Sequence, residues 1–226
     1  MKLLHITDTH TYHNQLKLQD ADVLCFTGDA TNYRDPSLNH KEFRDFYEWL
    51  TSIRNKYKRI IVIGGNHDSF LFHNEKEVKK LFKNIDVDYL HDSSVVIDGV
   101  EFYGSPWSPT FGDWCFMQNR NTLNRRWELI PQSTQVLLTH TPPKGILDLT
   151  LNRDGLLERC GCNALLKTVY KLPNLKAHLY GHLHSSRDVD NVGILNREGI
   201  QFSNASAVLD GQFNYGIQHH GNIIEI

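Results

Sequence analysis

The sequence has 226 residues, of which 40% are hydrophobic and 22% charged, and this composition excludes a disordered, collagen-like or coiled-coil chain. The 24 basic and 26 acidic side chains give a formal net charge of -2, so we do not expect binding to long nucleic acid. The length suits a single domain over residues 1–226. Aliphatic runs are too short to span a membrane and the N-terminus turns polar too early for a signal peptide, which predicts a cytoplasmic protein without membrane contact.

Short aliphatic or β-branched runs, each ending in a cluster of Asp, His, Gly or Asn, recur along the chain. We expect strands over residues 2–7, 23–27, 59–63, 136–139 and 177–180. Strands with polar tips at this spacing are typical of an α/β fold. Because the carboxyl ends of strands in such sheets gather along one edge, where loops can hold polar groups, we expect the tips to converge.

The segments between the strands contain helical patterns, one hairpin and one irregular stretch. Apolar residues recur at helical spacing over residues 43–57, and further helices are expected over about residues 75–82 and 162–172. An Asp-Gly pair within residues 95–103 supplies the positive φ angles of a tight hairpin turn. Residues 104–126 lack a clear period and are predicted to form a long loop, of a kind that is often functional.

The polar tips carry side chains that are suited to binding metal. These are Asp8, His10, Asp29, Asn66, His140, His182 and His184. Neutral imidazoles and oxygen donors suit divalent Mn, Fe, Zn or Ni. The pairs in Asp8-x-His10 and His182-x-His184 are two residues apart, so an extended segment turns both donors toward one face. This set exceeds one tetrahedral site and predicts two adjacent metals with a shared carboxylate, an arrangement that clamps a phosphoryl oxygen.

In chain order, the motifs at these tips resemble those of the calcineurin-like metallophosphoesterases. They are Asp8-x-His10, Gly28-Asp29, Gly65-Asn66-His67-Asp68, Thr139-His140 and Gly181-His182-Leu183-His184. A narrower similarity, to the small metallophosphoesterase-domain (MPPED-like) subfamily linked to cyclic-nucleotide phosphodiesterase activity, lies in Gly104-Ser105-Pro106-Trp107, Asp113-Trp114 and Asn204-Ala205-Ser206. The resemblance implies a four-layer α/β/β/α sandwich with two mixed sheets.

The resemblance also implies a role for each residue of the motifs. The first metal would be held by Asp8, His10, Asp29 and His184, and the second by Asp29, Asn66, His140 and His182. His67 matches a histidine beside the metals that either stabilises phosphorane charge or protonates the leaving oxygen. Asp68 is expected to orient His67 and raise its pKa. The cofactor would be two divalent ions, manganese first, with iron, zinc or nickel as alternatives.

The implied reaction is in-line attack by metal-bound hydroxide on a small, nucleotide-like phosphodiester, with cyclic nucleotides among the candidates. A phosphomonoesterase of broad specificity is the nearest alternative, and a non-catalytic scaffold on the same fold is an alternative from another class. Trp107 is a candidate for stacking a base, although packing within the loop would also explain it. Asn204 is a candidate substrate contact or a turn residue. The oligomeric state is left open.

Overall fold

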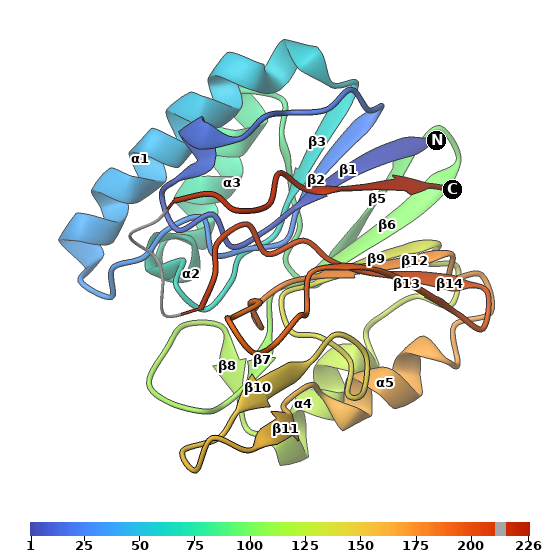
Figure 1. The fold of residues 1–226 in the computed structure, drawn as a ribbon. Coiled ribbons are helices and arrows are strands. Elements are labelled where there is room, and N and C mark those ends of the chain that lie inside the picture. Colours follow the sequence, from blue (N-terminus) through green and yellow to red (C-terminus); the bar gives the residue numbers. More distant parts are fainter. Residues whose placement is uncertain (211–215) are drawn as a thin grey trace.

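The computed structural model describes residues 1–210 and 216–226, and within them two larger sheets form the body of the molecule (Figure 1). The first has the strand order β15-β1-β2-β3-β4. Its strands are β1 (Lys2–Ile6), β2 (Val23–Phe26), β3 (Arg59–Val62), β4 (Asp88–Tyr89) and β15 (Asn222–Glu225). Strands β1 to β4 run parallel, and β15 pairs antiparallel with β1, so this sheet is mixed.

The second sheet has the order β13-β14-β12-β9-β6-β5. Its strands are β5 (Ser93–Ile97), β6 (Val100–Ser105), β9 (Val136–Thr139), β12 (Ala177–Tyr180), β13 (Gly193–Arg197) and β14 (Ile200–Asn204). The four central strands are parallel and both edge strands are antiparallel. Two small ribbons lie apart from it: β7 (Ser108–Pro109) with β8 (Met117–Gln118), and β10 (Leu149–Leu151) with β11 (Leu157–Arg159).

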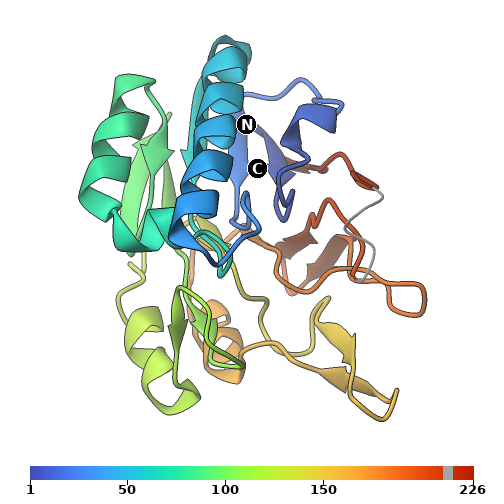
Figure 2. The ribbon, with the colours of Figure 1, turned by 90° about the vertical axis from the view of Figure 1, so that its left-hand side faces the viewer.

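Helices cover the outer face of each sheet (Figures 1 and 2). The first sheet carries α1 (Pro36–Ile53), α2 (Ser69–His73) and α3 (Glu75–Asn84), with the 3-10 turns η1 (His13–Gln15) and η2 (Arg54–Lys56). The second carries α4 (Arg120–Trp127) and α5 (Asn163–Val169). The predicted α/β/β/α sandwich with two mixed sheets is therefore confirmed. In the described part of the chain, no helix has both the length and the apolar character to cross a bilayer.

Buried residues on alternate strand positions build three apolar layers. On β1, Leu4 and Ile6 pack under α1, whereas Leu3 packs between the sheets. The outer layer of the second sheet joins Leu137 of β9 to Leu165 of α5. Because successive side chains of a strand point to opposite faces, a strand that is covered on both sides needs apolar residues at every position. This requirement explains why the sequence shows continuous aliphatic runs.

Each strand expected from the sequence is present with ends within one residue, and the hairpin is β5–β6. The first predicted helix begins earlier, at Pro36, where the Asp35 side chain accepts hydrogen bonds from the backbone N–H groups of Ser37 and Leu38. A proline in the first turn after such an N-cap is a strong start signal. The apolar period of α1 alone did not reveal it, because the buried residue of the first turn is the polar Asn39.

The expectation that residues 104–126 form one long loop was wrong in part. The segment contains β7 and β8, and α4 begins at Arg120, with Asn119 as its N-cap. Leu123 and Trp127, four residues apart, are buried under the second sheet. Two apolar residues give too weak a period to predict a helix, but their burial stabilises one here.

Loss of packing between the sheets should destabilise the whole molecule. Leu138 is fully buried in this layer, and Leu138→Ala should lower the free energy of unfolding by about 2–5 kcal/mol, as other buried leucine truncations do. Leu156→Ala removes a leucine that is 64% exposed and should change the free energy of unfolding by less than about 0.5 kcal/mol. Denaturant titration of both variants measures the difference, and equal midpoints would contradict the inter-sheet placement of Leu138.

Candidate metal centre

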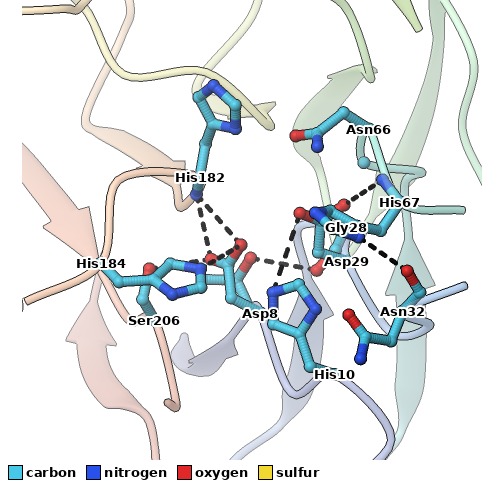
Figure 3. A network of polar contacts seen from close by, with 12 residues as sticks. Asp8, His10, Gly28, Asp29, Asn32, Asn66, His67, His182, His184 and Ser206 are labelled. Atoms are coloured by element: carbon cyan, nitrogen blue, oxygen red, sulfur yellow. Dashed lines mark hydrogen bonds and ion pairs between the residues drawn. The ribbon is translucent and has the colours of Figure 1, made fainter. Parts of the chain in front are cut away.

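The polar tips of strands from both sheets meet at one edge of the sandwich, and Figure 3 shows several of their side chains gathered there. The tips of β1, β2 and β3 come from the first sheet, and those of β9 and β12 from the second. An isolated parallel bridge between Thr7 and Ser206 joins the two sheets beside them. Together these tips carry all the predicted ligand residues: Asp8, His10, Asp29, Asn66, His140, His182 and His184.

The backbone of several of these residues is left-handed. Asp8, His10, Asp29 and His182 have φ angles of 51°, 42°, 54° and 70°. Residues with a Cβ rarely adopt this conformation, and the strain it carries is typically found at functional sites. Backbone hydrogen bonds hold the turns: the N–H of Asp8 donates to the carbonyl of Gly28 (2.9 Å), and that of His10 to the carbonyl of Asp29 (3.1 Å). The loops after β1 and β2 therefore brace each other.

The first group of candidate ligands comprises Asp8, His10 and His184, whose donor atoms lie within 4.8 Å of one another. Asp8 Oδ1 is 3.2 Å from His184 Nε2. Asp8 Oδ2 accepts hydrogen bonds from the backbone N–H of His182 (3.0 Å) and the hydroxyl of Ser206 (2.8 Å), as Figure 3 shows. Loops that follow β1, β12 and β14 thus hold this carboxylate in one orientation.

The second group comprises Asp29, His140 and His182, again within 4.8 Å of one another. His140 Nε2 lies 3.3 Å from Asp29 Oδ2 and 2.9 Å from Asn66 Oδ1, which brings the amide into the same group. His140 Nδ1 is 2.9 Å from the carbonyl oxygen of Thr27. Because a carbonyl only accepts, Nδ1 carries a proton, and Nε2 is the nitrogen that would present its lone pair to a cation once its own proton is displaced.

Asp29 lies between the two groups. Its Oδ2 is 3.9 Å from His10 Nε2 of the first group and 3.3 Å from His140 Nε2 of the second. Its Oδ1 accepts a hydrogen bond of 2.8 Å from the backbone N–H of His67. One carboxylate oxygen is therefore held by the chain, and the other faces both groups, as a shared ligand would require.

Burial and charge set the protonation states. Burial alone would raise the pKa of Asp29, but the neighbouring His140, His67 and His10 hold it well below its usual range. Burial lowers the pKa of His140, but Asp29 outweighs it and raises that pKa to about 9. Burial lowers the pKa of His10 and of His182 to about 3, so both are neutral at physiological pH. The site thus offers an ionised Asp29 carboxylate and the neutral imidazoles of His10 and His182, whereas His140 holds a proton that a cation must displace.

The donor set fits a pair of divalent cations. Carboxylate, amide and imidazole donors are the ligands of Mn, Fe, Zn and Ni sites. Glycines bring the carboxylates close to the neighbouring backbone: a Cβ added to Gly65 would overlap Asp29 Oδ1, and one added to Gly181 would overlap Asp8 Oδ2. Any larger residue at either position would push a carboxylate out of place.

Comparison with known proteins agrees with this geometry. Residues 1–186 match the family described as calcineurin-like phosphoesterase. The chain belongs to this family. The predicted family resemblance is therefore confirmed, and residues 1–186 include every candidate ligand described above.

Relatives with curated sequences share the domain. Human metallophosphoesterase domain-containing protein 1 is 35% identical over 208 residues, covering 81% of this chain and 60% of that protein. A UPF0046 protein of Caenorhabditis elegans is 33% identical over 218 residues, covering 91% of this chain and 69% of that protein. The chain therefore spans about 60% of the length of the human relative.

The solved structure of TT1561 from Thermus thermophilus is similar to the fold of this family member. The TM-score is 0.61 at 13% sequence identity, and the match covers 91% of this chain and 90% of that chain. At this identity the likeness supports the sandwich architecture alone.

His67 stands beside both groups without belonging to either. Its Nδ1 is 2.9 Å from the carbonyl oxygen of Asn32, so this nitrogen carries a proton (Figure 3). Its ring centre is 4.8 Å from that of His10 and 4.2 Å from that of Trp114. The Arg34 guanidinium covers the Trp114 ring at 3.6 Å. These contacts fix the plane of the His67 ring.

The expectation that Asp68 orients the His67 ring was wrong, because the partner of His67 Nδ1 is the Asn32 carbonyl and the Asp68 carboxylate is bonded elsewhere. Asp68 Oδ2 accepts from the backbone N–H groups of Asp29 and Gly65, both at 2.8 Å, and Oδ1 accepts from the N–H (3.1 Å) and hydroxyl (2.9 Å) of Thr31. The backbone turns between Gly65 and Asp68, which directs this carboxylate beneath the Asp29 loop. Burial and the nearby Asp29 raise its pKa to about 6. Asp68 thus positions Asp29 rather than His67.

Of the two interpretations of Trp107, base stacking and packing within its segment, the contacts of the ring favour packing. Its indole N–H donates to Asp92 Oδ2 (2.9 Å), and the guanidinium of Arg126 lies 4.1 Å over its ring. From the same segment, Phe111 and Trp114 line the cavities at the site, together with Phe72 of α2. An aperiodic aromatic segment signals that some ring faces the site, but spacing alone does not identify which one.

Asn204 lies beside the site but is fully buried. Its Nδ2 donates to the carbonyl of Leu183 (2.9 Å), and its Oδ1 accepts from the N–H (3.0 Å) and hydroxyl (2.9 Å) of Ser206. Because Asn204 has no exposed surface and is bonded to Leu183, the structure favours a role in supporting the loop between His182 and His184 over contact with substrate.

Cation binding should compete with protons at this site. His140 must lose a proton to act as a ligand, and the buried ring is held by Asp29 at a pKa of about 9. Below that pH, affinity for manganese should rise about tenfold per pH unit for each proton displaced. Calorimetry on metal-free protein between about pH 6 and pH 8 measures this slope. His140→Gln should bind more weakly with a flatter slope, and a pH-independent wild-type affinity would contradict the assignment.

Proposed function

We propose that the chain is a metal-dependent phosphodiesterase that hydrolyses small, nucleotide-like diesters, with cyclic nucleotides among the candidates. The position of Asp29 Oδ2, 3.9 Å from His10 Nε2 and 3.3 Å from His140 Nε2, is the observation that carries the proposal. Two cations that share one carboxylate can hold two oxygens of the same phosphoryl group. Membership of the calcineurin-like phosphoesterases supports hydrolysis of a phosphate ester.

The proposed ligands are Asp8, His10, Asp29 and His184 for one cation, and Asp29, Asn66, His140 and His182 for the other. Manganese is our first choice, and iron, zinc and nickel suit the same donors. When bound, these cations supply positive charge that polarises the phosphoryl oxygens and lowers the pKa of water.

The remaining chemistry falls to His67. In hydrolysis, the oxygen of water forms a bond to phosphorus while the bond from phosphorus to the leaving oxygen breaks. The leaving oxygen needs a proton, and we assign its donor to Nε2 of His67, because Nδ1 is committed to the Asn32 carbonyl. The proton released by water returns His67 to its acid form through solvent. The contacts to His10 and Trp114 keep the ring in place throughout.

Turnover of model substrates tests the function. Chelator-stripped protein should hydrolyse bis(p-nitrophenyl) phosphate only after manganese is added, and p-nitrophenyl phosphate more slowly. Asp29→Asn should lower both metal content and turnover, by at least about 100-fold, because it removes the shared ligand itself rather than an outer partner. A preference for the monoester would indicate a phosphatase. No turnover with manganese, iron, zinc or nickel would favour a binding scaffold.

A further prediction separates proton donation by His67 from simple contact with the phosphate. His67→Ala should keep the wild-type metal content and lower kcat about 10²- to 10⁴-fold on alkyl diesters, whose leaving oxygen needs a proton. The loss should be smaller on p-nitrophenyl esters, because p-nitrophenolate leaves without one. Equal losses on both kinds of ester would return His67 to the role of a phosphate contact.

A further inference from the structure

The cavity at the candidate ligands is too small for a whole substrate. It has a volume of about 140 Å³, below the range of about 300–1,000 Å³ that is usual for ligand sites. Two neighbouring cavities extend it. One, of about 250 Å³, shares Asn66 and His67 with the central cavity and is walled by Trp114. The other, of about 480 Å³, shares Phe111, Thr150, His182 and Leu183 with it.

We call the larger cavity the hairpin pocket, because much of its wall comes from the β10–β11 hairpin, the yellow hairpin that projects from the body of the molecule in Figure 2. Its lining includes Phe111, Arg120, Thr150, Leu151, Arg153 and Cys160. It shares no lining residue with the cavity walled by Trp114. A phosphoryl group in the centre thus has two separate spaces for organic substituents.

Phe111 gives the hairpin pocket a face for stacking. The side chain is 60% exposed, and its ring centre is 5.3 Å from that of His182. An exposed aromatic ring beside a polar centre can bury its face against a flat ligand, and it loses little side-chain freedom in doing so. Arg120 and Arg153 are also exposed on the lining and can donate to the polar edge of such a ligand, although Glu158 there offers the opposite charge.

The wall of the hairpin pocket is fixed to the ligand loop. Asn191 is fully buried, and its Nδ2 donates to the carbonyls of Leu149 (2.8 Å) and His184 (3.0 Å). Its Oδ1 accepts from the N–H of Leu149 (2.9 Å). At the same end of the hairpin, Arg159 of β11, which pairs with Leu149, forms an ion pair with the buried Asp148 (2.8 Å). The base of the hairpin therefore keeps a constant position relative to the candidate metal ligands.

We propose that the hairpin pocket binds the substituent that stays on phosphorus after cleavage, and that this substituent is flat and largely apolar, such as a nucleobase or an aryl group. The inference rests on the proposed function, since it names the substrate class of the same site. His67, the assigned proton donor, lines the other cavity, which places the leaving group there. The retained group then occupies the hairpin pocket and leaves with the product monoester.

Three substrates with the same p-nitrophenolate leaving group test this assignment. Bis(p-nitrophenyl) phosphate retains an aryl group, methyl p-nitrophenyl phosphate retains a methyl group, and p-nitrophenyl phosphate retains none. Phe111→Ala should lower kcat/KM about tenfold for the aryl diester, chiefly through KM, because it removes one stacking face. The other two substrates should change by less than about twofold.

Two further variants serve as controls. Phe111→Tyr keeps a flat ring and should restore the aryl preference. Leu156→Ala removes an exposed leucine from the turn of the same hairpin, outside the pocket lining, and should leave all three substrates unchanged. An equal effect of Phe111→Ala on the three substrates, or no effect on any, would overturn the proposal.

Equilibrium binding separates this proposal from the proposed function. If the wild-type protein hydrolyses none of the three substrates with any of the four metals, the phosphodiesterase proposal fails, but the pocket can still be tested. Manganese-loaded protein should bind adenosine 5′-monophosphate about tenfold more weakly after Phe111→Ala, with unchanged affinity for inorganic phosphate. Unchanged affinity for both probes would overturn the proposed role of the hairpin pocket in binding a flat substituent, whatever the result for catalysis.

Discussion

The carboxylate of Asp29 is held at the point where loops from both sheets meet, and the rest of the site is arranged around it. One oxygen accepts the N–H of His67, and the other faces His10 from the first sheet and His140 from the second. Its own N–H is held by Asp68. A shift of one sheet by an ångström would separate these partners. The apolar layer between the sheets is therefore a condition for the site as well as for the fold.

A second ring of polar groups stabilises the loops that carry these residues. Asn39 of α1 is fully buried, and its Nδ2 lies within hydrogen-bonding distance of the carbonyls of His67 (2.8 Å) and Tyr33 (2.7 Å). Its Oδ1 accepts from the N–H of Phe70 at the start of α2 (2.8 Å). A buried amide with all its groups bonded orders its neighbours, whereas one left unbonded would cost free energy. The helix thus positions the loop after β3 as well as covering the sheet.

The sequence predicted those features of the fold and of the site that depend on local patterns of residues. Aliphatic runs predicted the strands, and their polar tips predicted the candidate ligands, because strand direction determines where a tip lies. The roles of Asp68 and Trp107 depended on contacts with residues distant in the chain, namely Asp29 and Thr31 for one and Asp92 for the other. The spacing of residues along the sequence does not predict such contacts. The same limit applies to Phe111 and Trp114, whose proximity to His182 and His67 arises only from the path of an aperiodic segment.

The β10–β11 hairpin pairs only with itself among the described strands, and it carries none of the candidate ligands. Its attachment through Asn191 uses main-chain atoms of Leu149 and His184, so it does not depend on the side chains of the hairpin. Apart from Arg159, whose ion pair with Asp148 also holds the base, residues along the hairpin can therefore be exchanged without disturbing either sheet or the centre. The candidate metal ligands and the hairpin that lines the substrate pocket can therefore change independently in evolution. Related proteins can keep the same metal centre and acquire a different substrate preference through substitutions in this one hairpin.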